Sequence, residues 1–175
     1  MRTRFRGYDK LDVITREIEV ALKGGFYYLA IIGSLTLPDI CSALESQDGT
    51  TSGKQYMHWC DSWLLPKYPF LTSSEIYSLR CGVIHQGNAM HPSKRYSRIL
   101  FTLPVPHNDV FLHNNILNDA LNLDAVTFCR DVLECGVNWY AQEKNNPHVV
   151  ANLPNQVRYY PKGIAPYIVG VPVIS

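Results

Sequence analysis

Two helix-start signals place the strongest constraint on the fold of this chain. Ser52-Gly-Lys-Gln55 and Thr72-Ser-Ser-Glu75 both match the capping box, in which a hydroxyl and a Glu or Gln side chain satisfy backbone N–H groups at a helix start. We therefore expect one helix from about 53 to 65, ended by Pro66. We expect another from 73 to 85 or 86, stopped by Gly87.

Helical periodicity also occurs on both flanks of these signals. Apolar residues recur three and four apart from about residue 9 to 32, and again from 122 to 144, and both patterns predict long helices. Thr36-Leu-Pro-Asp39 has the composition of a helix start, so we expect a further short helix through Leu44. The sequence thus predicts about five helices.

The remaining segments lack the helical pattern. Residues 96–114 contain two short β-prone runs separated by Pro-Val-Pro-His-Asn, which predicts a small insert resembling a β-hairpin. Five prolines between 147 and 172 predict an extended C-terminal tail over 147–175. For 175 residues we expect one mainly α domain, a helical bundle with its core over about 9–146.

Composition narrows the class of protein. The chain is 46% hydrophobic and 18% charged, which is typical of a folded globular protein and excludes a disordered chain. Its net charge of +1 means that any polyanion site must be a local patch. The five cysteines form no CxxC pair, so we expect reduced thiols and a cytoplasmic location. The apolar stretch 26–37 is shorter than the roughly 20 residues of a membrane span, so no membrane association is expected.

Arg80 and His85 are the leading candidates for chemistry. Imidazole has an unperturbed pKa of about 6.5 and can move a proton near neutral pH, while a guanidinium can hold a phosphate in two hydrogen bonds. The pair therefore suits cleavage of RNA by attack of a 2′-hydroxyl, with no metal or other cofactor. On one α-helix, a five-residue offset separates the two side chains by about 140°, unless the helix end unwinds or a symmetric dimer supplies a second pair.

The segment Leu79-Arg-Cys-Gly-Val-Ile-His-Gln-Gly87 resembles the signature of the HEPN family, which is an arginine, four to six residues and a histidine on a late helix. The resemblance implies a helical bundle and a metal-independent endoribonuclease of toxin or antiphage type. It also implies action as a homodimer, Arg80 and His85 as the catalytic pair, and a cognate antitoxin as a further partner. Family members often carry a polar residue after the arginine, where this chain has Cys81. A non-catalytic dimerisation or regulatory module of the same shape is therefore the alternative.

A basic segment follows the motif and could bind substrate. Lys94, Arg95 and Arg98 are expected to hold RNA phosphates, and Tyr96 to stack a base. The alternative is a solvated loop or edge strand, just as Arg80 and His85 could serve only as cations near a helix C-terminus.

Other polar residues offer weaker hypotheses. Asp39 and Glu45 could orient Arg80 or His85 from across the bundle, or simply lie near a helix start. His58, Cys60 and Asp61 can each bind metals, and a metal-dependent enzyme is a third hypothesis. No second ligand pair accompanies them, so no metal site is predicted.

Overall fold

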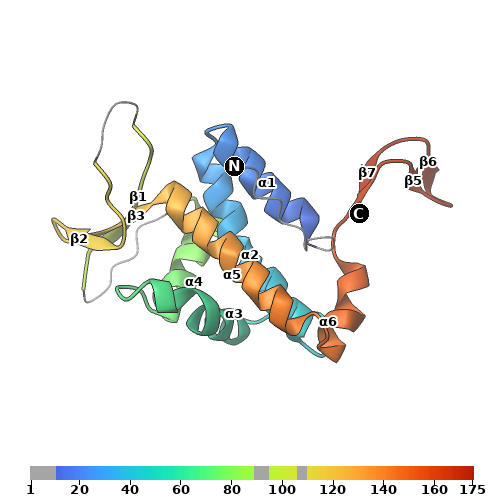
Figure 1. The fold of residues 1–175 in the computed structure, drawn as a ribbon, viewed down its shortest axis with the longest axis horizontal. Coiled ribbons are helices and arrows are strands. Elements are labelled where there is room, and N and C mark those ends of the chain that lie inside the picture. Colours follow the sequence, from blue (N-terminus) through green and yellow to red (C-terminus); the bar gives the residue numbers. More distant parts are fainter. Residues whose placement is uncertain (1–10, 89–94, 106–109) are drawn as a thin grey trace.

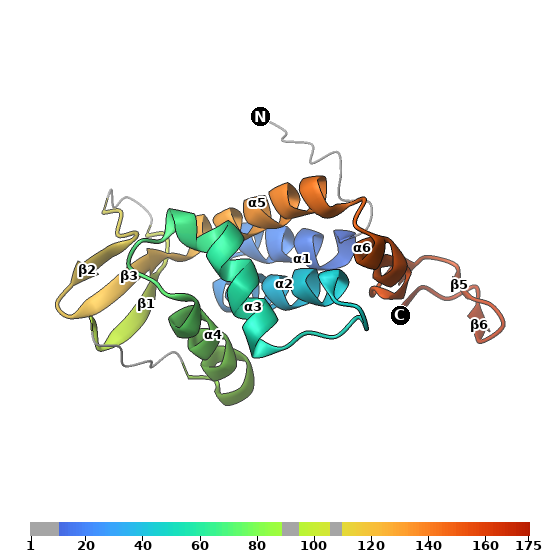
Figure 2. The same ribbon diagram turned by 90° about the horizontal axis from the view of Figure 1, so that it is seen from below.

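A computed structural model describes residues 11–88, 95–105 and 110–175 of the protein. These residues form a helical body with a small sheet at one end of its long axis and the C-terminal segment at the other (Figures 1 and 2). The mainly α prediction is confirmed. The helices are α1 (Asp12–Lys23), α2 (Tyr27–Glu45), α3 (Gly53–Trp59), α4 (Ser73–Cys81), α5 (Ala125–Glu143) and α6 (Pro147–Asn152). The strands are β1 (Arg98–Thr102), β2 (Asn115–Leu117), β3 (Ala120–Asp124), β4 (Tyr159–Tyr160), β5 (Gly163–Ile164), β6 (Ile168–Val169) and β7 (Val173–Ile174).

Helix α2 lies at the centre of the body. It contacts α1, α5, α3, α6 and α4, and its buried face supplies much of the apolar core. The expected start of a short helix at Thr36 is wrong, because Pro38 lies inside α2. The Thr36 hydroxyl donates to the Ile32 carbonyl at 2.7 Å instead of capping a new helix. The core contains fully buried aromatic side chains: Tyr56, Trp59, Tyr68, Tyr96, Phe128 and Trp139.

The long N-terminal helix expected over 9–32 is interrupted, and this prediction is wrong. Residues 9 and 10 lie outside the described residues, and α1 ends at Lys23. Gly25 has φ of +75°. The amide of Phe26 donates to the Ala21 carbonyl at 2.8 Å, and the amide of Gly25 donates to the Leu22 carbonyl at 3.3 Å. This is the Schellman arrangement that closes a helix, and it turns the chain back so that α2 packs on α1.

Both capped helices are confirmed. Thr72 and Glu75 form the complete capping box of α4, and the Ser52 hydroxyl accepts from the amide of Gln55. Each helix ends in a π-helical turn with i→i+5 hydrogen bonding, Cys60–Leu64 after α3 and Gly82–Gln86 after α4. A 3₁₀ turn, Leu65–Lys67, completes the first, and Gly87 stops the second with φ of +61°.

The small sheet differs from the predicted insert at 96–114. Its order is β1-β3-β2, with β1 parallel and β2 antiparallel to β3. The first β-prone run forms β1, but residues 110–112 of the second are not in a strand. The hairpin lies later, where Asn118 and Asp119 take positive φ and join β2 to β3. Helix α5 consequently starts at 125 rather than 122, capped by the Asp124 carboxylate.

The tail is not extended throughout, so this prediction is wrong at its start. Pro147 occupies the first turn of α6, where its missing N–H is not needed, and the Asn146 side chain caps that helix. A 3₁₀ turn, Leu153–Asn155, follows. Beyond it, β4 pairs with β7 and β5 with β6, which forms a narrow antiparallel ribbon.

One helix among the described residues could cross a membrane by length and composition. This is α2, and half of its most apolar window is buried inside the structure, as in the core helix of a soluble protein. The expectation of no membrane association stays a prediction.

The turn at Gly25 gives the first test. Gly25→Ala should lower the free energy of unfolding by about 1 kcal/mol, because a Cβ is strained at this positive φ. Gly25→Asn should lower it less, since asparagine tolerates the left-handed region better. Urea unfolding of both variants measures this, and equal losses would contradict the backbone explanation.

Candidate functional site

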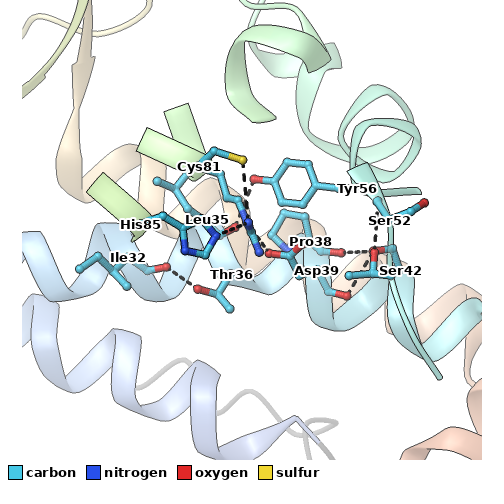
Figure 3. Close-up of polar contacts among 12 residues, drawn as sticks. Ile32, Leu35, Thr36, Pro38, Asp39, Ser42, Ser52, Tyr56, Cys81 and His85 are labelled. Carbon is cyan, nitrogen blue, oxygen red and sulfur yellow. Dashed lines mark hydrogen bonds and ion pairs between the residues drawn. The ribbon is translucent and has the colours of Figure 1, made fainter. Parts of the chain in front are cut away.

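Arg80 and His85 lie in direct contact at the end of α4. The Nη1 atom of Arg80 is 3.0 Å from Nε2 of His85 (Figure 3). The Arg80 side chain is 19% exposed, whereas His85 lies at the surface. The structure therefore joins the two residues that the sequence singles out, within a single chain.

The π-helical turn explains how a five-residue offset becomes a contact. Between α4 and Gly87 the backbone hydrogen bonds run i→i+5, so the turn is wider than an α-helical one. Residues five apart then approach the same face, rather than standing about 140° apart as on an α-helix. Such turns are common at functional sites.

Two contacts hold this turn in place. The Tyr28 hydroxyl, at the start of α2, donates to the Val83 carbonyl at 3.4 Å. The amide of Asn88 donates to the Gly82 carbonyl at 3.0 Å, and a Cβ on Gly82 would collide with the backbone oxygen of Asn88. The contact between Gly82 and Asn88 requires the chain to fold back closely after His85.

Asp39 fixes the other side of Arg80. Its Oδ2 accepts from Arg80 Nε at 2.8 Å, and its side chain is 13% exposed. The residue lies in the middle of α2, so its backbone is held by the core. The interpretation that Asp39 orients Arg80 from across the bundle is thus supported by the geometry.

Burial and pairing act in opposite directions on these charges. Burial raises the pKa of the Asp39 carboxyl, and the hydrogen bond and charge of Arg80 only partly offset this. For Arg80, burial lowers the pKa, but the hydrogen bond and charge of Asp39 outweigh it and leave the pKa raised. The guanidinium therefore stays charged at any physiological pH.

The contact also defines the form of His85. A guanidinium has only donors, so the Arg80–His85 hydrogen bond requires a lone pair on Nε2. In this contact Nε2 is therefore the acceptor, and Nδ1 is the ring nitrogen left to donate.

Arg80 keeps donors for a ligand. Its Nε binds Asp39, and its Nη1 contacts His85 and, at 3.9 Å, the Sγ of Cys81. Among the described residues, no protein acceptor binds its Nη2 group. Two N–H bonds therefore remain to meet an anionic oxygen.

The basic segment is only partly as predicted. Lys94 lies outside the described residues. Tyr96 is 1% exposed, so the prediction that it stacks a base is wrong: its ring packs in the core. Arg95 pairs with Glu75 at 3.1 Å, and Arg98 is exposed at the start of β1. Phosphate binding by these arginines stays a prediction.

The other polar candidates lie apart from the pair. Glu45 accepts from the Trp139 indole and, with Ser42, Lys54, Gln55 and His58, lines a cavity of about 280 Å³. Neither Arg80 nor His85 lines it. Burial raises the pKa of Glu45, and the Trp139 hydrogen bond partly opposes the shift. In the described part of the chain, no three His, Cys, Asp or Glu residues are grouped to hold a metal.

Sequence reasoning missed Tyr28 and Tyr77, which lie near the motif. The Tyr77 ring centroid is 5.5 Å from that of Tyr56, and its hydroxyl lies over the backbone of Gly53. Neither tyrosine belongs to a local motif, so only the packing of α2 and α3 against α4 identifies them.

Comparison of the chain with family models, with curated proteins and with solved structures gives no match. The chemistry of the site therefore has to be inferred from its own geometry.

The balance between burial and pairing at Asp39 gives a pH prediction. Because its folded-state pKa is raised above the ordinary value of about 3.9, the folded state holds this proton more tightly. The contribution of Asp39 to stability should thus be greatest below that value and fall as pH rises through the raised pKa. Unfolding free energies of wild type minus Asp39→Asn, measured in urea across this range, should decrease with pH. An increase would show that the Arg80 pair dominates instead.

Proposed function

We propose that the protein is a HEPN-like, metal-independent endoribonuclease that acts as a homodimer. The observation that carries the proposal is the 3.0 Å contact between Arg80 and His85, with Asp39 holding the guanidinium. An exposed imidazole beside a fixed cation suits phosphodiester cleavage. A toxin or antiphage role, with a cognate antitoxin, is part of the same proposal.

The reaction follows from the two side chains. When RNA binds, a phosphate oxygen takes donors of Arg80, and His85 Nε2 is released to accept the proton of the adjacent 2′-hydroxyl. The 2′-oxygen then bonds to phosphorus and the bond to the 5′-oxygen breaks. Arg80 stabilises the negative charge that gathers on the phosphoryl oxygens. The products are a 2′,3′-cyclic phosphate and a 5′-hydroxyl.

A second copy supplies the remaining proton. The leaving 5′-oxygen must be protonated, and the partner subunit's His85, in its cationic form, can do this if the two motifs share one cleft. Phe26 and Leu29 support such an interface, because they are 61% and 59% exposed and flank Tyr28, which touches the motif turn. Exposed apolar residues beside a site favour a protein partner.

The second candidate is a non-catalytic dimerisation or regulatory module. It is favoured by Cys81, which replaces the polar residue common after the arginine and contacts Arg80 Nη1. In this case Arg80, Asp39 and His85 form a structural network only, and RNA is not cleaved.

Cleavage by the purified protein tests the proposal. In excess chelator, single-stranded RNA should be cut to 2′,3′-cyclic phosphate ends. Arg80→Ala and His85→Ala should each lower the rate by at least about 100-fold, because each removes a group that acts in the transition state. His148→Ala, at another exposed histidine, should cleave at the wild-type rate. Equal cleavage by all four proteins would indicate a contaminating nuclease, and no cleavage at all would favour the regulatory module.

The interface has its own test. Leu29→Glu should shift the protein from dimer to monomer in sedimentation velocity, because it places a charge in an apolar contact. Val150→Glu is the matched control, since Val150 is 56% exposed on α6. A monomeric wild type, or a dimer unaffected by Leu29→Glu, would contradict this interface.

A further inference from the structure

We propose that Tyr28 and Tyr77 are the base-stacking residues of this site, and that they bind the two nucleotides on either side of the phosphate held by Arg80. The inference rests on the proposed ribonuclease function and names how its substrate is held. It assigns to these two rings the role that Tyr96, buried in the core, does not perform.

Tyr28 lies beside the histidine end of the site. Its hydroxyl donates to the carbonyl of Val83, two residues before His85 in the same π-helical turn. The residue is nevertheless 55% exposed, so the phenol oxygen is anchored while much of the ring faces solvent. A ring fixed at one end and open on its surface can stack a base with little further loss of side-chain entropy.

Tyr77 lies three residues before Arg80, one helical turn earlier on α4. Its ring centroid is 5.5 Å from that of Tyr56, and a Cβ on Gly53 would come within 2.8 Å of its Cζ, so one part of the ring packs against the core. The residue is partly exposed. The pKa of Tyr77 is raised, first by the side chain of Cys81, the residue that follows Arg80.

The order along α4 and its terminal turn is therefore Tyr77, Arg80, then the turn that carries His85 and touches Tyr28. Figure 3 shows His85 and Cys81 on one side of Tyr56 above α2. A single strand laid along α4 and its terminal turn would place its phosphate on Arg80 and a base on each tyrosine. Single-stranded RNA is commonly bound in this way, by cations on phosphates and aromatic rings on unstacked bases.

The partner is single-stranded RNA rather than a duplex or an acidic peptide. In a duplex the bases are stacked on each other and offer no face to a ring. A peptide anion would use Arg80 but gains nothing specific from two aromatic rings near it. The chain's net charge of +1 also favours binding in which stacking supplements a few phosphate contacts.

The experiment measures binding in the His85→Ala background, where RNA stays intact. The probes are fluorescein-labelled oligoadenylate of about ten nucleotides and an abasic oligomer with the same number of phosphates. Tyr28→Ala and Tyr77→Ala should each weaken oligoadenylate binding about ten-fold, while Tyr28→Phe and Tyr77→Phe, which keep the ring, should each weaken it much less than the matching Ala variant. Tyr159→Ala is the matched control, since Tyr159 is also 55% exposed but lies in the C-terminal ribbon.

The abasic oligomer separates stacking from phosphate contact. It should bind weakly, and neither tyrosine substitution should weaken it further, whereas Arg80→Ala should. Circular dichroism checks folding, and Tyr77→Leu replaces Tyr77→Ala if the smaller residue destabilises α4.

Each outcome decides the inference. A Phe variant as weak as its Ala counterpart would show that the hydroxyl group, rather than the ring, carries the binding and would overturn stacking. Unchanged affinity in the Ala variants, or no binding of oligoadenylate by the parent, would overturn it too. The cleavage assay of Arg80→Ala and His85→Ala decides the proposed function separately, so the two failures are distinguishable.

Discussion

Burial of α2 is the constraint on which the rest of the structure depends. Five helices contact it, and two of them approach so closely that a side chain has no room. A Cβ on Gly33 would lie 2.7 Å from the Ile18 side chain on α1, and one on Gly136 of α5 would lie 2.9 Å from Leu37. With α2 fixed by this packing, Asp39 is a rigid reference point inside the fold. The ion pair with Arg80 then transfers that rigidity to the end of α4.

This arrangement explains why a partly buried charge pair is retained. Replacing a buried ion pair by apolar side chains is often neutral or stabilising, so stability alone is a weak reason for Asp39 and Arg80. Orientation is a better one, because Nε binds Asp39, Nη1 faces His85 and the remaining nitrogen points to no acceptor among the described residues. Burial raises the pKa of the Asp39 carboxyl, which means that the fold disfavours its charged form. Keeping a charge pair at this position therefore lowers the stability of the fold, and a contact with a purely structural role would not require charged groups.

Features coded by neighbouring residues could be predicted from the sequence, and features set by distant packing could not. The capping box of Thr72 and Glu75 is local, and the structure has it as expected. The break at Gly25 was missed because the apolar periodicity continues through it, and only the positive φ of that glycine ends the helix. The local sequence around Pro38 suits both a helix start and the interior of α2. Packing contacts with residues far along the chain decide between these two positions. Tyr96 is a further example at the candidate site. An aromatic residue among cations is typical of an RNA-binding surface, yet the Tyr96 ring is buried in the core.

The motif itself shows how local and distant factors combine. The five-residue spacing of Arg80 and His85 can be read from the sequence, but on a regular α-helix this spacing would place their side chains on different faces. The π-helical turn brings them together, and its position follows from Gly82, which allows the close return of Asn88, and from Tyr28, which binds Val83 from α2. Helix α2 thus positions the guanidinium through Asp39. Through Tyr28, it also positions the turn on which His85 lies. A single rigid helix that positions both members of the proposed catalytic pair gives the preorganisation that such a reaction requires, because little reorganisation then remains when a substrate binds.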